Sequence, residues 1–375
     1  MRTPICDMLG IEFPIVAFTH CRDVVTAVSK AGGLGVLGAI SFTPEELEVE
    51  LAWIENELGD LPYGVDVLVP AKEADTANFS GGADVIPEEH KQFVKHLMEK
   101  YDVPALAEDD QPRRTGRAAG ESTKDRASSL VDIALGHKIR LVASALGPPP
   151  PEMVANAHAR GVPVAALVGK RQHAERQMQV GVDIIVAQGY EAGGHTGDIG
   201  TMVLVPEIVD TVAPLPVLAA GGIASGRQLA AALALGAQGA WTGSVWLTTE
   251  EAETHPVVKQ KFLSATSSDT LRSRSSTGKP ARQLRSAWTD EWEDPANPDP
   301  LPMPLHGMLT FEARQRINQG AYAPGSGSEK LANYFVGQVV GSLNQVKPAR
   351  RVLLEMVEEY IDVAQQFSDS ISDAG

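Results

Sequence analysis

Cysteines and long apolar runs are scarce in this sequence, and each shortage excludes a class of protein. The 375 residues contain two cysteines, Cys6 and Cys21, without the spacing of metal ligands. Two thiols are too few for a disulfide scaffold and are typical of a reducing compartment. No apolar run reaches the roughly 20 residues that span a bilayer. The short run near the N-terminus is broken by Glu12 and Pro14, unlike a signal peptide. We therefore expect a cytoplasmic protein without a membrane partner.

Basic residues are outnumbered by acidic ones. The chain has 32 lysines and arginines against 48 aspartates and glutamates, a formal net charge of −16 at pH 7. An acidic surface repels phosphate backbones, so nucleic acid is not an expected partner. The apolar content of 43% is enough for a large core, and the length fits one barrel domain with insertions.

Short apolar runs recur along the chain, with room for a helix between most of them. Each run is continuous rather than alternating, as in parallel strands that are covered on both faces. The predicted strands are Phe13–Ala17, Leu34–Ala39, Gly64–Val69, Ile139–Ala143, Pro163–Val168, Asp183–Gln188, Pro216–Ala219 and Gly239–Thr242. Helix starts are marked by Thr43–Glu46 and Ser225–Gln228, which both have the pattern of a capping box. Eight strands with this rhythm predict an α/β fold of the (β/α)₈ class, the TIM barrel.

Two long stretches interrupt the alternation of strands and helices. We predict that the barrel is formed by residues 1–70, 129–246 and 330–370, with insertions at 71–128 and 247–329. Insertions that follow barrel strands lie on the catalytic face. Both are therefore expected to form a lid or small extra domain there, with surface decoration as the alternative.

The two insertions differ in composition. The first contains a predicted helix, Glu88–Lys100, and a polar tract, Glu108–Ser129, that we expect to be a mobile loop. The second contains the proline-rich run Asp294–Pro304, which leaves little room for regular structure. After it, Ala349–Phe367 has the pattern of a last barrel helix.

Two glycine turns follow the seventh and eighth predicted strands. Gly221-Gly222 lies between a strand and a helix, and Gly243-Ser244 comes after the next strand. Glycine allows a ligand to approach the backbone, and a helix N-terminus offers free N–H groups to an anion. Barrels often bind phosphate with the loops after strands seven and eight, so we expect one phosphate here.

A third glycine-rich loop, Gln188–Gly197, reads QGYEAGGHTG and places His195 after the sixth predicted strand. Together with Ala31–Gly35, Ala219–Ile223 and Gly337-Gln338, this loop resembles the nitronate monooxygenase family, formerly called 2-nitropropane dioxygenases. The resemblance covers most of the barrel. Flavin-dependent enoyl-acyl-carrier-protein reductases and NADH:quinone reductases are similar in this loop, so it is specific for the superfamily rather than for one reaction.

The resemblance implies a barrel that binds FMN and a small-molecule substrate. In the family, the histidine that corresponds to His195 faces the flavin and acts on the substrate. The residues implied to contact the flavin are Val16, Ala17 and Phe18 along the isoalloxazine ring, Gln188, Gly193 and Gly194 beside it, and Gly221, Gly222, Gly243 and Ser244 at its phosphate.

The sequence departs from the family pattern at two places. Thr19-His20 stands where the family usually has a proline–methionine pair, and Asp66 stands where it has an asparagine near the flavin. A carboxylate there would disfavour an anionic substrate or an anionic reduced flavin, unless it is protonated or paired with a cation such as His20. We expect these changes to alter the substrate more than the cofactor.

The leading functional hypothesis is oxidation of an alkyl nitronate by dioxygen to a carbonyl compound and nitrite, with FMN carrying the electrons. His195 would bind the nitro oxygens or take an α-proton from a neutral nitroalkane. The alternative enzyme is an NAD(P)H-dependent reductase of enones, enoyl thioesters or quinones, in which His195 stabilises developing charge on oxygen. A flavin-binding or phosphate-binding barrel without chemistry would have no need of His195 in its loop. A homodimer is compatible with either enzyme.

The remaining histidines show no functional pattern. No two of them have metal-ligand spacing on a common element, so no metal site is expected. We interpret seven as solvated polar side chains: His90, His96, His137, His158, His173, His255 and His306.

Overall fold

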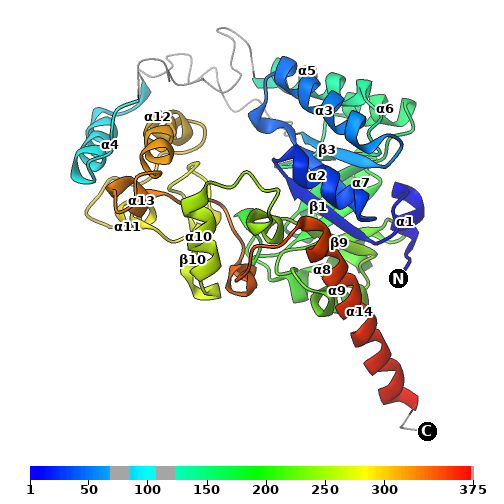
Figure 1. Ribbon diagram of the computed structural model, residues 1–375. Helices are drawn as coiled ribbons and strands as arrows, with labels where there is room; N and C mark the ends of the chain where they lie inside the picture. The colour runs from blue at the N-terminus through cyan, green and yellow to red at the C-terminus, as the bar shows by residue number, and fades with distance from the viewer. Residues whose placement is uncertain (68–84, 107–122, 373–375) are drawn as a thin grey trace.

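The computed structural model describes residues 1–67, 85–106 and 123–372, and its main body is a closed barrel of parallel strands (Figure 1). The order around the barrel is β1-β2-β3-β4-β5-β6-β8-β9, and β9 closes it by pairing with β1. The barrel strands are β1 (Ile15–Thr19), β2 (Leu34–Gly38), β3 (Tyr63–Val67), β4 (Leu141–Ser144), β5 (Val164–Val168), β6 (Ile184–Gln188), β8 (Val217–Ala220) and β9 (Gly239–Thr242). Each overlaps one of the eight predicted runs, so the predicted TIM-barrel fold is confirmed.

Helices cover the outside of the barrel. They are α2 (Arg22–Lys30), α3 (Pro44–Leu58), α5 (Thr123–Gly136), α6 (Pro151–Ala159), α7 (Arg171–Val180), α8 (Thr201–Val212), α9 (Gly226–Ala234) and α14 (Ala349–Ser372). The predicted capping box at the start of α3 is confirmed, because Thr43 Oγ1 accepts from Glu46 N at 3.1 Å and the Glu46 carboxylate accepts from Thr43 N at 2.9 Å. The end of α14 projects beyond the barrel (Figure 1).

Side chains fill the inside of the barrel. Interior residues such as Val36 and Val186 form one core with the short helix α1 (Pro4–Leu9), separate from the core between the strands and the outer helices. At the other end of the strands, Phe18 stacks on Trp241 with ring centroids 6.3 Å apart. Both rings border the open space above the barrel, so they form its floor.

A second hydrophobic core lies beside the barrel and contains helices from both insertions. They are α4 (Glu88–Lys100), α10 (Pro256–Ser264), α11 (Ala287–Glu293), α12 (Leu305–Gly320) and α13 (Gly327–Leu331). Phe93 of α4 meets Trp292 of α11 edge-on, with 4.8 Å between ring centroids. Lys100 Nζ pairs with Glu291 at 2.5 Å. The two insertions therefore pack as one body, which we call the cap region; Figure 1 shows α4 beside α11, α12 and α13.

A small sheet connects the cap region with the loop after β6. Strand β10 (Thr270–Ser273) pairs with β11 (Ala281–Leu284), and β11 pairs antiparallel with β7, which consists of Gly194–His195. The short 3₁₀ helices are η1 (Ala39–Ser41), η4 (Ser244–Thr248), η5 (Ser267–Asp269) and η6 (Gln338–Ser342).

Some of the predicted boundaries differ from the structure. Residues 68–84 and 107–122, which include the end of the third predicted strand and most of the polar tract, lie outside the described residues. Residues 123–129 form the beginning of α5, where Ala127 is buried in the barrel core, so the prediction of a mobile loop is wrong for this end of the tract. Leu331 and Val336, assigned from the sequence to the barrel segment, are buried in the second core. Among the helices of the described residues, none is long and apolar enough to cross a membrane.

Candidate active site

A cavity of about 910 Å³ lies between the C-terminal ends of the barrel strands and the cap region. Small-molecule sites typically enclose about 300–1,000 Å³. Val16 and Ala17 do not line the cavity: Val16 is buried in the core inside the barrel, and Ala17 is buried in the core between the strands and the outer helices. The predicted site residues that do line it are Phe18, Asp66, Gln188, Gly193, Gly194, His195, Gly221, Gly222, Gly243 and Ser244.

The two glycine turns form one cradle at the edge of this cavity. Gly221 and Gly222 have φ angles of 92° and 73°, a backbone conformation that favours glycine. A Cβ on Gly243 would meet no atom within 4 Å, so this turn borders open space. In the part of the chain that the structure describes, the backbone N–H groups of Gly222, Gly243 and Ser244 have no acceptor. Free N–H groups from two neighbouring turns can bind an anion such as a phosphate group.

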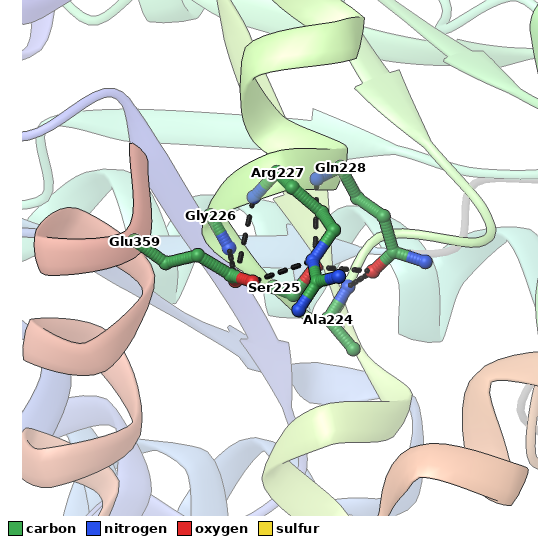
Figure 2. A network of polar contacts seen from close by, with 6 residues as sticks. All are labelled: Ala224, Ser225, Gly226, Arg227, Gln228 and Glu359. Atoms are coloured by element: carbon green, nitrogen blue, oxygen red, sulfur yellow. Dashed lines mark hydrogen bonds and ion pairs between the residues drawn. The ribbon is translucent and has the colours of Figure 1, made fainter. Parts of the chain in front are cut away.

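The N-terminus of α9, which we expected to offer free N–H groups to this phosphate, is already occupied. Figure 2 shows the Glu359 carboxylate of α14 accepting from Gly226 N at 2.7 Å and pairing with Arg227 Nε at 2.5 Å. Ser225 Oγ accepts from Gln228 N at 3.4 Å, but the Gln228 carboxamide bonds the N–H that precedes Ser225, so the predicted capping box is incomplete. The expectation of free N–H groups at α9 is therefore wrong, and the glycine turns are the part of this edge with N–H groups left for an anion.

The Gln188–Gly197 loop is held in place by contacts with α8. The Glu191 carboxylate accepts from Thr201 N at 2.9 Å and from Thr201 Oγ1 at 2.8 Å. Gly189 packs so closely on the same residue that a Cβ would lie 2.0 Å from Thr201 Oγ1. A side chain at Gly189 would therefore push the loop away from α8.

The C-terminal Gly337-Gln338 pair joins this loop to the phosphate cradle. Gln338 N donates to the Glu191 carbonyl at 2.9 Å, and Gly337 N donates to Ser244 Oγ at 2.8 Å. A Cβ on Gly193 would lie 2.8 Å from the backbone of Val336. The glycines in these segments allow three backbones to meet beside the cavity.

His195 belongs to a strand rather than to a free loop. It pairs in register with Ala281 of β11, so the cap region fixes the backbone position of the histidine. Its Nδ1 lies 3.3 Å from the Pro280 carbonyl. A carbonyl only accepts hydrogen bonds, so Nδ1 carries the proton of the neutral ring and Nε2 keeps its lone pair.

The surroundings of His195 keep its imidazole neutral at pH 7. Burial is the largest influence and lowers the pKa; the Pro280 carbonyl opposes this, and the charge of Lys279 lowers the pKa further. The cavity therefore contains an unprotonated nitrogen that can accept a proton near neutral pH.

Arg282 is a positioning residue that the sequence did not reveal. It lies opposite Gly194 in β11 and is almost fully buried. Its Nε donates to the Tyr190 carbonyl at 3.1 Å, and its guanidinium lies 4.5 Å from the centre of the Tyr190 ring. Only the pairing of β11 with β7 brings this arginine to the histidine loop, so no local motif could have identified it.

The two departures from the family pattern lie on the opposite wall, at the ends of β1 and β3. His20 donates from Nδ1 to the Gly38 carbonyl at 3.1 Å, and burial lowers the pKa of His20. Burial also raises the pKa of Asp66 to about 8. His20 is therefore neutral and is not the cation that we considered as a partner for Asp66.

Several other histidines are not the solvated side chains that we expected. His306 is fully buried with Nε2 2.8 Å from the Ser275 carbonyl, and burial lowers its pKa to about 4. His90 is buried with Nε2 2.9 Å from the Asp299 carbonyl. The rings of His306 and His90 pack within the cap region, where their polar atoms form internal hydrogen bonds. His255 is partly buried and lines the cavity, whereas His173, which also lines it, is exposed as expected.

One group of possible metal ligands occurs among the described residues. Potential ligand atoms of Cys21, Asp23 and Glu253 lie within 4.8 Å of one another. The Cys21 thiol donates to the Glu251 carbonyl, and burial raises the pKa of this thiol. A protonated, hydrogen-bonded thiol is a poor metal ligand, so we assign no metal to this group.

Comparison with known proteins agrees with this geometry. The model of the nitronate monooxygenase family matches residues 2–359. By class, then, the protein is a flavin-dependent oxidoreductase on a TIM barrel. The chain belongs to the nitronate monooxygenase family.

Individual relatives span nearly the whole chain. The Mycobacterium tuberculosis protein Rv1533, which is named as a monooxygenase without a stated substrate, is 59% identical over 98% of both chains. A Staphylococcus saprophyticus protein named as a nitronate monooxygenase is 29% identical over 85% of this chain and 89% of its own. The solved structure of a nitroalkane oxidase from Streptomyces ansochromogenes has a TM-score of 0.80 at 25% identity, covering 97% of this chain and 99% of its own.

Proposed function

We propose that the flavin is FMN. The free N–H groups of Gly222, Gly243 and Ser244 form one cradle, which suits the single phosphate of a mononucleotide. The bound flavin supplies electron transfer between substrate and dioxygen. Purified protein should be yellow, and chromatography of the flavin released on denaturation should give FMN and not FAD. Colourless protein that FMN cannot reconstitute would contradict this assignment.

We further propose that the enzyme oxidises alkyl nitronates with dioxygen. Two nitronate anions and one dioxygen molecule give two carbonyl compounds and two nitrite ions. The observation that supports this most is the unprotonated Nε2 of His195, which lines the cavity while Nδ1 is bound to the Pro280 carbonyl. This nitrogen can take the α-proton of a neutral nitroalkane and so form the nitronate within the cavity. The positive charge of Lys279, on the same wall, attracts the resulting anion.

The cap region gives this chemistry a sheltered site. Tyr334 and Phe335 line the cavity together with Phe18 and Trp241, which form its floor. Aromatic side chains around a bound flavin exclude part of the water from the reacting atoms and strengthen electrostatic interactions there.

A second candidate function is an NAD(P)H-dependent reductase. A cavity of about 910 Å³ has room for a substrate larger than a small nitronate beside the flavin. Arg176, Arg272 and Lys279 also line it and could receive the phosphates of a dinucleotide.

One experiment separates the two candidates. The flavin absorbance is recorded without oxygen while NADH, NADPH and an alkyl nitronate are added in turn. We expect the nitronate to bleach the flavin and both nucleotides to leave it oxidised. Rapid bleaching by NADH or NADPH alone would assign the protein to the reductases. Whether the chain forms a homodimer, which is compatible with either enzyme, can be tested by sedimentation velocity.

A further inference from the structure

Asp66 is a buried acid that borders the cavity. It is the fourth residue of β3, and the residue is 7% exposed. In the barrel register it stands between Gly38 of β2 and Ala143 of β4, neither of which has a polar side chain. The carboxyl group lines the cavity that would hold the flavin, on the wall across from His195.

No charged group compensates this carboxyl group within the described residues. His20, from the turn after β1, fills the space beside Gly38, where a Cβ would lie 2.6 Å from its ring. Its Nδ1 proton is used by the Gly38 carbonyl, and burial lowers its pKa, so it is neutral. The neighbouring strand ends present the neutral residues Ala145 after β4 and Gln188 on β6. Burial raises the pKa of Asp66 to about 8, and no charged group among the described residues contributes to this shift.

A protonated carboxyl group has the same hydrogen-bonding pattern as a carboxamide. It offers one O–H donor and one carbonyl acceptor, as the asparagine of the family pattern offers N–H donors and one carbonyl acceptor. Asp66 can therefore offer the hydrogen-bond donor that an asparagine would offer at this position only while the carboxyl keeps its proton. An ionised Asp66 would present two acceptors and a negative charge to the ring system instead.

We propose that Asp66 binds the flavin as a neutral carboxylic acid, donating its O–H to an acceptor atom of the isoalloxazine ring, and that loss of this proton weakens flavin binding. The inference rests on the proposed FMN site. Binding of the flavin to the protonated form raises the pKa of Asp66 further, by linkage. Affinity for FMN is thus constant below the pKa of the free protein and falls as the pH rises through it.

The test is the dissociation constant of FMN between pH 6 and about pH 9.5, measured by flavin fluorescence on apoprotein of the wild type and of Asp66→Asn. For the wild type we expect a constant value below about pH 7.5 and a rise of up to about tenfold per pH unit above pH 8. The Asp66→Asn protein should bind at all pH values as tightly as the wild type does at low pH. Ionisation of the flavin itself affects both proteins equally.

Two controls make the result specific. His20→Gln should show the same fall in affinity as the wild type, because His20 is not the titrating group. Infrared difference spectra on adding FMN should show a protonated carboxyl band that shifts in the wild type and is missing from Asp66→Asn. If the wild-type affinity for FMN is independent of pH, or if the affinity of Asp66→Asn falls equally with rising pH, the inference about Asp66 is overturned but the proposed FMN site is not. Failure to bind FMN at any pH would overturn the proposed cofactor together with it.

Discussion

Replacing Glu359 by glutamine tests whether a residue of the last helix stabilises the barrel next to the phosphate cradle. The Glu359 carboxylate accepts from Gly226 N at 2.7 Å and pairs with Arg227 Nε at 2.5 Å, at the N-terminus of α9 (Figure 2). Glutamine has the same shape and can still accept one hydrogen bond from Gly226. The substitution therefore removes the negative charge and leaves the packing unchanged.

The expected loss of stability follows from these contacts. A hydrogen bond to a charged group contributes about 1.5–3 kcal/mol, against about 0.5–1.5 kcal/mol for a neutral one. The favourable interaction of a carboxylate with a helix N-terminus contributes about 0.3–1 kcal/mol. The Arg227 side chain is 75% exposed, so its ion pair adds little. We expect Glu359→Gln to lower the free energy of unfolding at pH 7 by about 1–2 kcal/mol, or the melting temperature by about 1–3 °C.

The effect should depend on pH in a defined direction. Partial burial tends to raise the pKa of Glu359, but the bonds from Arg227 and Gly226 outweigh it and hold the pKa below its ordinary value of 4.5. A group with a lowered pKa in the folded state stabilises the protein above its unfolded pKa, and this contribution is lost as the pH falls through the folded pKa. The wild type and the variant should therefore differ at pH 7 and converge below about pH 4.5.

The assay is urea unfolding followed by circular dichroism at pH 7 and at several acidic values. Glu358→Gln is the matched control, because Glu358 is adjacent in the chain but exposed, and its ion pair with Arg351 lies at the surface. We also expect FMN affinity to stay within about twofold, since Gly226 N is already occupied and does not bind the phosphate. Equal stability of Glu359→Gln and Glu358→Gln at pH 7 would refute the stabilising role. A tenfold loss of FMN affinity would indicate that the N-terminus of α9 does contribute to binding the phosphate.

Three further substitutions test the active site. His195→Asn should keep FMN but lose about a hundredfold or more in turnover of a neutral nitroalkane, and less with the preformed nitronate, since asparagine cannot accept a proton; wild-type rates with both substrates would remove His195 from the mechanism. Gly222→Asp should raise the dissociation constant of FMN at least about tenfold by placing a negative charge at the phosphate, whereas Gly59→Asp, at a remote glycine with a φ of 61°, should not; equal affinities would place the phosphate elsewhere. Arg282→Met should lower the free energy of unfolding by about 2 kcal/mol through loss of its charged hydrogen bond to Tyr190. It should also slow turnover while FMN affinity stays within about threefold. If hydrogen exchange at Gly194 is as slow as in the wild type, Arg282 does not position the loop.

The barrel and most of its cavity residues could be predicted because their signals are local. A parallel strand covered on both faces needs a continuous apolar run, so all eight strands were visible as runs of residues. The turn at Gly221-Gly222 needs positive φ angles, and Gly189 leaves room for Thr201, so these glycines marked the cradle and the histidine loop directly. Because His195 follows the sixth predicted strand, its position in the chain was sufficient to place it at the C-terminal face of the barrel.

Tertiary structure alone decided how these parts are completed. The residues that support the site from outside its loops are distant from them in the chain. Arg282 hydrogen-bonds to Tyr190, and Glu359 accepts a hydrogen bond from Gly226. No periodicity or motif records such pairs, because a strand or helix has the same local pattern whichever partner it meets. The raised pKa of Asp66 is likewise a product of burial, which depends on every element packed around the carboxyl group. The sequence by itself thus determined the barrel, its glycine turns and the histidine loop, whereas the joined cap region, the strand that holds His195 and the charge state of the cavity required the folded chain.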